Sequence, residues 1–387
     1  MRSRKYDSVS PVRVRDEASG ILHEQVKLRD HSRKCTLQVL LAVLFFAASR
    51  TSSIFDACRR LRRAPCDDTM QDALAEQLPG RVELTRRLNR ALSCRLPKSL
   101  FRKRRPMAID LTEIPYHGQP QRDPRELCRG RPKGGTTHFH TYATLYVVRR
   151  GERFTIALTP VGGNDSLPEV MQRLLRRASQ IGLKPRYLLL DRAFYNLDVV
   201  AYLQTARYPF AMPVVYRGRR AKNPEKAQGP QRFLAWEHSG WSTHRLRNQG
   251  RTRRVQIAVS YNRRKRGKYR RLVYAYWGFQ PSSPAWLRQE YRRRFGIEAS
   301  YRQMNQARIR TCSRSPALRL FYVGLALILR NVWVWVHRQL ARRCGRDGLT
   351  LFLECLRFRT LLLILQRFAE SLLGTAEAHE AQPAAPG

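Results

Sequence analysis

Apolar residues in the first part of the chain recur at the spacing expected of buried and amphipathic helices. The run "LQVLLAVLFFAA" at residues 37–48 is apolar on every side and too short to span a bilayer, which indicates a helix buried within protein. The segments "IFDACRRLRR" and "TMQDALAEQL" follow, with Ser53 and Asp68 as their candidate capping residues. Residues 1–98 are therefore expected to form a helical domain.

Beyond residue 98 the pattern changes to that of strands. The segment "SLPE" at residues 166–169 has the form of a capping box and predicts the start of a helix, and Asn196 is the candidate cap of a second helix. These helices alternate with the short apolar runs "RYLLLD" and "PFAMPVV", which are typical of buried central strands. The pattern predicts a mixed α/β sheet with helices on its faces. Three strands are expected first, at residues 107–118, 138–148 and 153–161, with a Gly-rich basic loop at 130–135.

Residues 216–278 interrupt this alternation. They are basic and rich in turn residues, and "RVQIAVSY" and "YRRLVYAYWGF" within them indicate strands, so a β-rich insertion is expected. Helix resumes at Ser283 and Pro284, a favourable cap and first helical residue, and the apolar run "LFYVGLALIL" indicates a second buried helix. The predicted divisions are 1–98, a core in two parts at 99–215 and 279–340, the insertion at 216–278, and a C-terminal helix with a disordered tail at 341–387.

The charge of the chain points to a polyanionic partner. Seventy-four Lys and Arg residues face 29 Asp and Glu residues, for a formal net charge of +45. A folded protein this basic repels itself unless it binds a polyanion, and nucleic acid is the leading candidate because Arg and Lys make most phosphate contacts. An anionic membrane surface is less favoured, because the charge runs along the whole chain. Residues 1–98 are accordingly assigned to DNA binding, with a plain helical scaffold as the alternative.

The cysteines indicate a reduced compartment. The eight cysteines form no CxxC pair and show no spacing typical of metal ligands. With no secretory signal recognisable, the expected location is the cytoplasm, in association with the nucleoid.

Three acidic residues stand out by their positions. Asp110 interrupts an apolar strand, Asp191 ends the run "YLLLD", and Glu298 lies in the helical stretch "YRRRFGIEASYRQMNQAR". Aspartate is costly in a buried strand unless it is paired or bound to a cation, and carboxylates are the hard oxygen ligands that Mg²⁺ prefers. Two such ions can activate a water or a 3′-hydroxyl at a phosphodiester. The simpler alternatives are that Asp191 caps the next helix and that Asp110 pairs with a buried arginine.

Basic and polar residues share the helical face of Glu298. At about 100° per residue, this face spans an arc of roughly 80°. A solvated stripe of charge is the alternative, although such stripes usually alternate in sign. Gly296 within the helix indicates a bend or a close backbone approach. The residues of this face are Tyr291, Arg294, Glu298, Arg302 and Asn305, whereas Phe295, Ile297 and Met304 are expected to point toward the core.

These residues match a known signature. Tyr291, Arg294 and Glu298 resemble the Y-x2-R-x3-E-x6-K pattern of the IS-four superfamily of insertion-sequence DDE transposases. The segments "AIDLTEIPYHG", "GTTHFHTYATLYVV", "LLLDRAFYN" and "RRFGIEASYRQMNQARIRT" resemble, in that order, segments of its haloarchaeal-type branch. The resemblance covers roughly residues 50–340.

The resemblance implies an RNase H-like catalytic core with a β-rich insertion between the second and third acids. Asp110, Asp191 and Glu298 would be the catalytic, metal-binding triad, holding two Mg²⁺ ions, with Mn²⁺ as a possible substitute. The resemblance further implies hydrolysis at the ends of an insertion sequence and joining to target DNA by a 3′-hydroxyl. The partners would be double-stranded DNA and a second copy of the chain, because two DNA ends must be held together. No membrane is expected as a partner.

The resemblance also implies contacts to the transposon end. Tyr291 and Arg294 would contact it near the cleavage site. Where the signature has a lysine this chain has Asn305, and Arg302 or Arg308 could supply the missing cation.

Two other functions remain open from the sequence. One is a catalytically inactive DNA-binding protein derived from a transposase, and the other is a structure-specific nuclease on the same fold. His138 and His140 share one side of a strand and indicate ordinary packing or a DNA contact more than a metal site, because no matching ligand follows. The segment "NRRKRGKYRR" at residues 262–271 is expected to be a phosphate-binding loop, with a solvated loop as the alternative.

Overall fold

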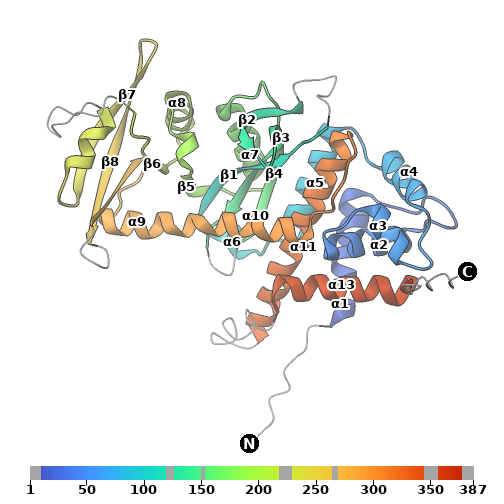
Figure 1. Cartoon of the computed structure of the whole chain (residues 1–387). Coiled ribbons are helices and arrows are strands. Elements are labelled where there is room, and N and C mark those ends of the chain that lie inside the picture. Colours follow the sequence, from blue (N-terminus) through green and yellow to red (C-terminus); the bar gives the residue numbers. More distant parts are fainter. Residues whose placement is uncertain are drawn as a thin grey trace, which may run out of the picture. The chain divides into compact units, whose positions relative to one another are not determined.

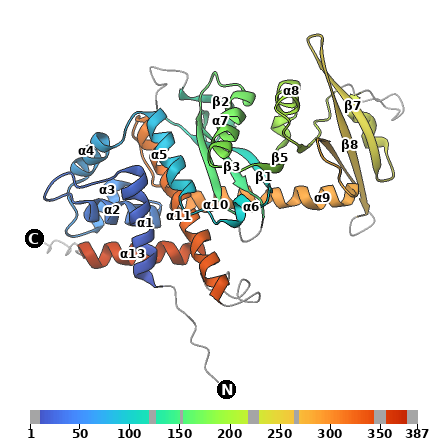
Figure 2. The same cartoon turned by 180° about the vertical axis from the view of Figure 1, so that it is seen from behind.

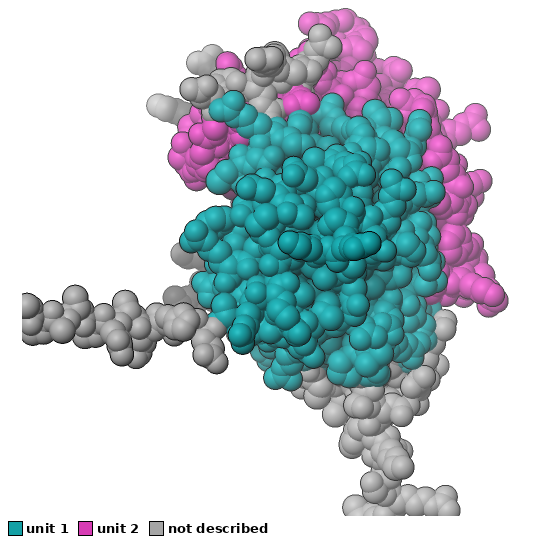
Figure 3. All heavy atoms as spheres, turned by 90° about the vertical axis from the view of Figure 1, so that its right-hand side faces the viewer, with its two compact units in different colours: residues 1–95, 302–387 teal, residues 96–301 magenta. Residues whose placement is uncertain are grey.

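The computed structural model describes residues 10–118, 126–149, 153–217, 229–263, 269–343 and 356–376. The chain divides into two compact units, coloured separately in Figure 3. Residues 96–301 form one of them, here called the sheet unit. Residues 1–95 and 302–387 together form the other, here called the helical unit.

A mixed sheet is the framework of the sheet unit (Figure 1). In the described residues it has nine strands in the order β2-β3-β1-β5-β6-β9-β8-β7, with β4 also paired to β3. Strands β1, β5 and β6 run parallel to one another, and β3 is antiparallel to β1. The predicted α/β fold class is therefore confirmed. The strands are β1 Arg105–Pro115, β2 Cys128–Lys133, β3 Thr136–Val147, β4 Thr155–Val161, β5 Pro185–Leu190, β6 Phe210–Pro213, β7 Gly240–Asn248, β8 Arg251–Arg263 and β9 Tyr269–Trp277.

The helices of the sheet unit begin where the sequence signals them. Ser166 and Glu169 form the predicted capping box at the start of α7, and the Asn196 side chain accepts a bond from the Val199 amide at the start of α8. Ser283 caps α9 in the same way. The described helices here are α6 Ser99–Arg102, α7 Leu167–Gln180, α8 Leu197–Thr205, α9 Pro284–Arg292, and α10 Gly296–Ala307, whose last six residues belong to the helical unit.

The prediction of a Gly-rich basic loop at residues 130–135 is wrong. Residues up to Lys133 form the edge strand β2, and the turn to β3 is confined to Gly134 and Gly135, both in the left-handed region. Most side chains of β2 are exposed, so this strand lacks the apolar alternation by which strands are recognised.

The insertion contains one strand more than predicted. Strands β8 and β9 match the two predicted segments, and β7 pairs with β8 in a hairpin that turns at Gln249 and Gly250. Strand β7 was not predicted because Leu246 is its one buried residue, whereas Thr243, Arg245 and Arg247 are exposed. Since β9 pairs with β6, the insertion extends the core sheet.

The helical unit is built from both ends of the chain. Helix α2 packs against α13, and α5 packs against α11; Figures 1 and 2 both show α13 beside α1 and α2. A strand-like bridge also joins Leu61 to Thr375. The elements are α1 Pro11–Ile21, a π-helical turn Leu22–Val26, α2 Leu37–Arg50, α3 Ile54–Arg60, α4 Asp67–Gln77, α5 Arg81–Ser93, α11 Pro316–Arg343 and α13 Phe358–Leu373.

Both predicted buried helices of this unit are confirmed. Residues 40–49 of α2 and 320–332 of α11 are buried. Residues 316–339 are long and apolar enough to span a membrane, but 78% of their 18-residue apolar stretch is buried within the protein, as in a core helix. Ser53 caps α3 as predicted, whereas Asp68 does not cap α4, which begins at Asp67.

The tail predicted to be disordered begins at residue 377 and lies outside the described residues, as do Cys344 and Cys355.

Candidate active site

Two strands bring the two aspartates to the same edge of the sheet. Strands β1 and β5 are parallel neighbours, and Ile109 pairs with Leu190 in their register. Asp110 directly follows Ile109 within β1, and Asp191 directly follows Leu190 at the end of β5. Because parallel strands carry equivalent positions to the same level, the two carboxylates become neighbours.

Two tyrosines hold the α9–α10 segment against these strands. The Tyr291 hydroxyl donates to the Leu190 carbonyl at 3.1 Å, next to Asp191. The Tyr301 hydroxyl donates to the Asp110 carbonyl at 2.8 Å and lies 2.7 Å from the Thr144 hydroxyl of β3. Each tyrosine therefore fixes the helix to the backbone beside one aspartate.

A single guanidinium contacts all three predicted acids. Arg294 lies in the short 3-10 turn Arg293–Phe295 that joins α9 to α10, and it is 4% exposed. Its Nη1 is 3.2 Å from Asp110 Oδ2, and its Nη2 is 3.5 Å from Asp191 Oδ1 and 2.6 Å from Glu298 Oε1. The structure thus gathers Asp110, Asp191 and Glu298 around one buried cation.

The three acids of this cluster carry more negative charge than the single Arg294 guanidinium can neutralise. The pKa of Asp110 is raised to about 6, chiefly by burial and also by the Asp191 and Glu298 carboxylates, against the opposing effects of Arg294 and the Leu111 amide. Glu298 Oε2 and Arg294 Nε are buried and have no hydrogen-bond partner among the described residues. Three carboxylates therefore share one guanidinium, which leaves the site suited to more positive charge.

The donor set fits a divalent cation in its chemistry. Three carboxylates from separate segments supply the hard oxygen ligands of Mg²⁺ or Mn²⁺, and Glu298 keeps one oxygen unbonded. Within the described residues, however, no three acidic, His or Cys side chains approach closely enough to hold a metal. The spacing of the three carboxylates is therefore that of a cluster bound to arginine.

Tyr291 is buried in this structure. It was expected to touch DNA, but it is 5% exposed and its hydroxyl is already bonded to the strand backbone. It therefore serves here to position the helix.

The other predicted DNA-binding residues follow in the helical unit. Arg302 and Asn305 are exposed, and Arg308 Nε donates to Asn305 Oδ1 at 3.4 Å.

The predicted continuous helix is interrupted just before Glu298. The 3-10 turn changes the helical phase, so Phe295 is 55% exposed and the expectation that it faces the core is wrong, whereas Ile297 and Met304 are buried as expected. A Cβ at Gly296 would lie 3.3 Å from the Arg153 guanidinium, so a close approach explains this glycine.

Tyr301 and Thr144 were missed from the sequence. Tyr301 lies three residues after Glu298, which places both on adjoining parts of one helical face, and this spacing was an available signal. Thr144 could be found only from the β1–β3 register, in which it faces Asp110.

The two histidines behave as strand residues. His140 is buried and meets the Tyr116 ring edge-on at 5.3 Å, and His138 lies 3.3 Å from the Thr137 hydroxyl. The expectation of ordinary packing agrees with these contacts. Residues 264–268 of the predicted phosphate-binding loop lie outside the described part of the chain.

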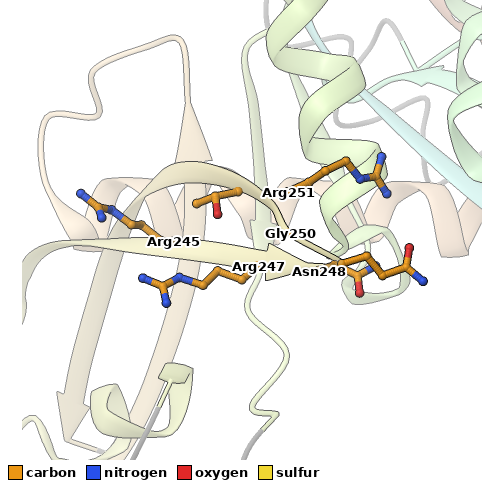
Figure 4. Close-up of a pocket in the computed structure, with 7 residues that line it drawn as sticks. Arg245, Arg247, Asn248, Gly250 and Arg251 are labelled. Atoms are coloured by element: carbon orange, nitrogen blue, oxygen red, sulfur yellow. The ribbon is translucent and has the colours of Figure 1, made fainter.

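An arginine-rich surface occupies the β7–β8 hairpin. Its tip borders an open hollow of about 730 Å³, and Figure 4 shows Arg245 and Arg247 extending to one side while Arg251 points away from them. Arg251 pairs with Asp198 at 2.8 Å, whereas Arg245 stands opposite Arg254 in the strand register. Residues 238–263 contain no Asp or Glu, so like charges oppose each other on this hairpin at a cost to stability.

Comparisons with known proteins identify a family and a similar solved structure. Residues 102–332 match the protein family described as "Transposase DDE domain". Among solved structures, the chain is similar to a piggyBac transposase synaptic complex with hairpin DNA determined by cryo-electron microscopy. The TM-score is 0.53 at 12% identity, over 98% of this chain and 84% of that one, and this likeness supports the RNase H-like fold. No curated protein matches the sequence.

Proposed function

Because this chain belongs to the family of transposase DDE domains, we propose that it cleaves DNA at the ends of an insertion sequence and joins those ends to target DNA. The observation that carries the proposal is the convergence of Asp110, Asp191 and Glu298 on one buried cation. Three segments far apart in the sequence supply these acids, whereas a merely structural ion pair would need only one acid. Placement in the haloarchaeal-type branch of the IS-four superfamily is part of this proposal.

Members of this family generally use divalent metal ions, and Asp110, Asp191 and Glu298 are the residues that would hold them. We propose two Mg²⁺ ions, with Mn²⁺ able to replace them. Bound there, such ions would lower the pKa of an attacking water or 3′-hydroxyl and neutralise charge on the leaving oxygen. Tyr291 and Tyr301 hold the backbone beside the two aspartates, so they would keep the ligands in place while DNA binds.

Double-stranded DNA is the proposed partner. The net charge of +45 favours phosphate binding. The arginines of the β7–β8 hairpin are suited to it because the hairpin contains no Asp or Glu, although Arg251 pairs with Asp198 of α8. The similar solved structure is a synaptic complex with hairpin DNA, which supports a DNA complex here as well.

Assembly and location are proposed on the same basis. A homodimer would hold two element ends together at the nucleoid in the cytoplasm. Residues 1–98 would help to bind those ends, as would Arg294, Arg302 and Arg308.

A cleavage assay tests the proposal. The purified chain is incubated with Mg²⁺ and labelled DNA bearing the inverted repeats that flank its reading frame. We expect Asp110→Asn, Asp191→Asn and Glu298→Gln each to reduce cleavage by about 10³-fold or more while DNA binding is retained. Asp198→Asn is the matched control, since Asp198 pairs with Arg251 away from these acids, and it should cleave normally.

The same assay separates the other candidate functions. Full cleavage by any of the three acid variants would refute the assignment of the triad. A wild-type chain that binds these ends without cutting them would be an inactive DNA-binding protein. A chain that cuts but never joins the ends to target DNA would be a nuclease.

A further inference from the structure

The Arg294 guanidinium occupies the position toward which the three acids point. Its two terminal nitrogens contact one oxygen each of Asp110, Asp191 and Glu298. Carboxylate oxygens bonded to a guanidinium are not available to a metal, and a divalent ion placed among the three acids would meet the positive charge of Arg294 at contact distance. Arginine and metal are therefore alternatives for the same ligands.

An ordinary buried ion pair would look different. Structural pairs are retained when the remaining hydrogen-bonding groups are satisfied. Here Arg294 Nε and Glu298 Oε2 are buried without partners among the described residues, and three carboxylates share one positive charge. The cluster is held together by Arg294 without being neutralised by it.

We infer that Arg294 is a tethered counter-cation that holds the three acids together in the metal-free protein and is displaced when divalent ions enter. This inference rests on the proposed function, because it assumes that these acids bind metal. The side chains of Asp191 and Glu298 are 45% and 37% exposed and Phe295 is exposed, so the cluster opens to solvent on this side. The guanidinium, which lies 5.8 Å from the centre of the Phe295 ring, can leave in that direction.

Displacement would couple metal binding to DNA binding. A freed guanidinium loses its carboxylate partners and gains the capacity to donate two bonds to a phosphate. A phosphate at the site would therefore stabilise the displaced position of Arg294, and metal would bind more tightly when DNA is present. By linkage, metal would strengthen DNA binding by the same factor.

Metal binding without DNA tests the inference directly. Mn²⁺ is titrated by calorimetry into the full chain and into Arg294→Gln, with Asp110→Asn to show that the heat arises at this site. We expect Arg294→Gln to bind Mn²⁺ on the order of tenfold more tightly, because entry no longer breaks charge-assisted hydrogen bonds. Arg293→Gln is the matched control: Arg293 belongs to the same turn but pairs with Glu290 at 3.0 Å, and its loss should leave the affinity unchanged.

Each outcome separates the inference from the proposed function. If wild type binds Mn²⁺ and Arg294→Gln binds it equally or more weakly, Arg294 does not compete with metal and the inference is wrong. If neither protein binds Mn²⁺ while both are folded, the metal-dependent function itself fails, and the inference with it. If Arg294→Gln does not fold, Arg294→Lys is used in its place. Lysine keeps the positive charge but carries it on one nitrogen, which cannot contact three carboxylates at once. This variant should then bind Mn²⁺ more tightly than wild type, and an unchanged affinity would overturn the inference.

Discussion

Asp110→Asn should stabilise the metal-free protein at neutral pH. The side chain of Asp110 is 15% exposed, and its pKa is raised from the ordinary 3.8 to about 6, chiefly by burial. Below about pH 4 the carboxyl is protonated in the folded and the unfolded chain, so it contributes no difference. Between about pH 4 and 6 the unfolded chain releases this proton first, so the stability of the folded chain falls as pH rises. Above about pH 6 the full loss of stability from burying the charged Asp110 carboxylate remains.

The size of this cost follows from the shift. A shift of about two pKa units, at about 1.4 kcal/mol each, corresponds to up to about 3 kcal/mol. Asparagine keeps the shape of the side chain and removes the charge, so Asp110→Asn should recover most of that energy at pH 7.5 and almost none at pH 4. For a unit of this size the melting temperature at pH 7.5 should rise by about 5–10 °C.

Thermal unfolding followed by circular dichroism in EDTA, at pH 7.5 and pH 4, measures both values. Asp198→Asn is the matched control, because its side chain is 51% exposed and its surface pair with Arg251 contributes less than about 1 kcal/mol. An Asp110→Asn protein less stable than wild type at pH 7.5 would refute the reasoning, since the ion pair with Arg294 would then outweigh the cost of burial.

Three further changes test other parts of the structure. Replacing Arg245, Arg247 and Arg254 together by Glu should weaken DNA binding at least about tenfold and flatten its dependence on salt, as measured by fluorescence anisotropy; unchanged binding would exclude the hairpin from the DNA interface. Tyr301→Phe removes the bonds to Asp110 and Thr144 and should cost about 1–2 kcal/mol in urea unfolding; full stability would show that these bonds contribute little. A Cβ at Gly324 would lie 2.5 Å from the Leu88 side chain, so Gly324→Ala should destabilise the helical unit by about 1–3 kcal/mol despite its better helix propensity. The Leu88→Ala substitution should lower the free energy of unfolding less in the Gly324→Ala protein than in wild type.

The strands and helices that bury apolar faces could be predicted from the sequence, whereas exposed strands could not. The apolar runs around Asp110 and Asp191 identified β1 and β5 because central strands are apolar on both faces. Strands β2 and β7 carry mainly exposed polar and basic residues, and the same composition is typical of loops. Pairing with a neighbouring strand, which no local pattern records, is what makes them strands.

The members of the candidate site could be proposed from the sequence, but their contacts could not. Asp110, Asp191 and Glu298 were singled out by their positions in the sequence, the resemblance gave them a metal-binding role, and the structure brings them together. The alternative that Asp110 pairs with a buried arginine also describes the structure, because that arginine is Arg294. The two interpretations are compatible if Arg294 holds the three acids in the metal-free protein and leaves them when metal binds. Neither the interruption of the helix at residues 293–295 nor the bond from Tyr301 could be inferred, because both depend on packing against strands distant in the sequence.

The pairing of α2 with α13 has a consequence during protein synthesis. The Arg359 guanidinium of α13 donates to the Ser49 carbonyl of α2 across 310 residues of sequence. At roughly 5–20 residues per second, the ribosome needs about 15–60 seconds to make the second helix after the first. Throughout that interval the apolar surface of α2 lacks its partner and is open to chaperones or aggregation. A chain released before residue 358 would carry all three acids and Arg294, yet its helical unit could not be completed.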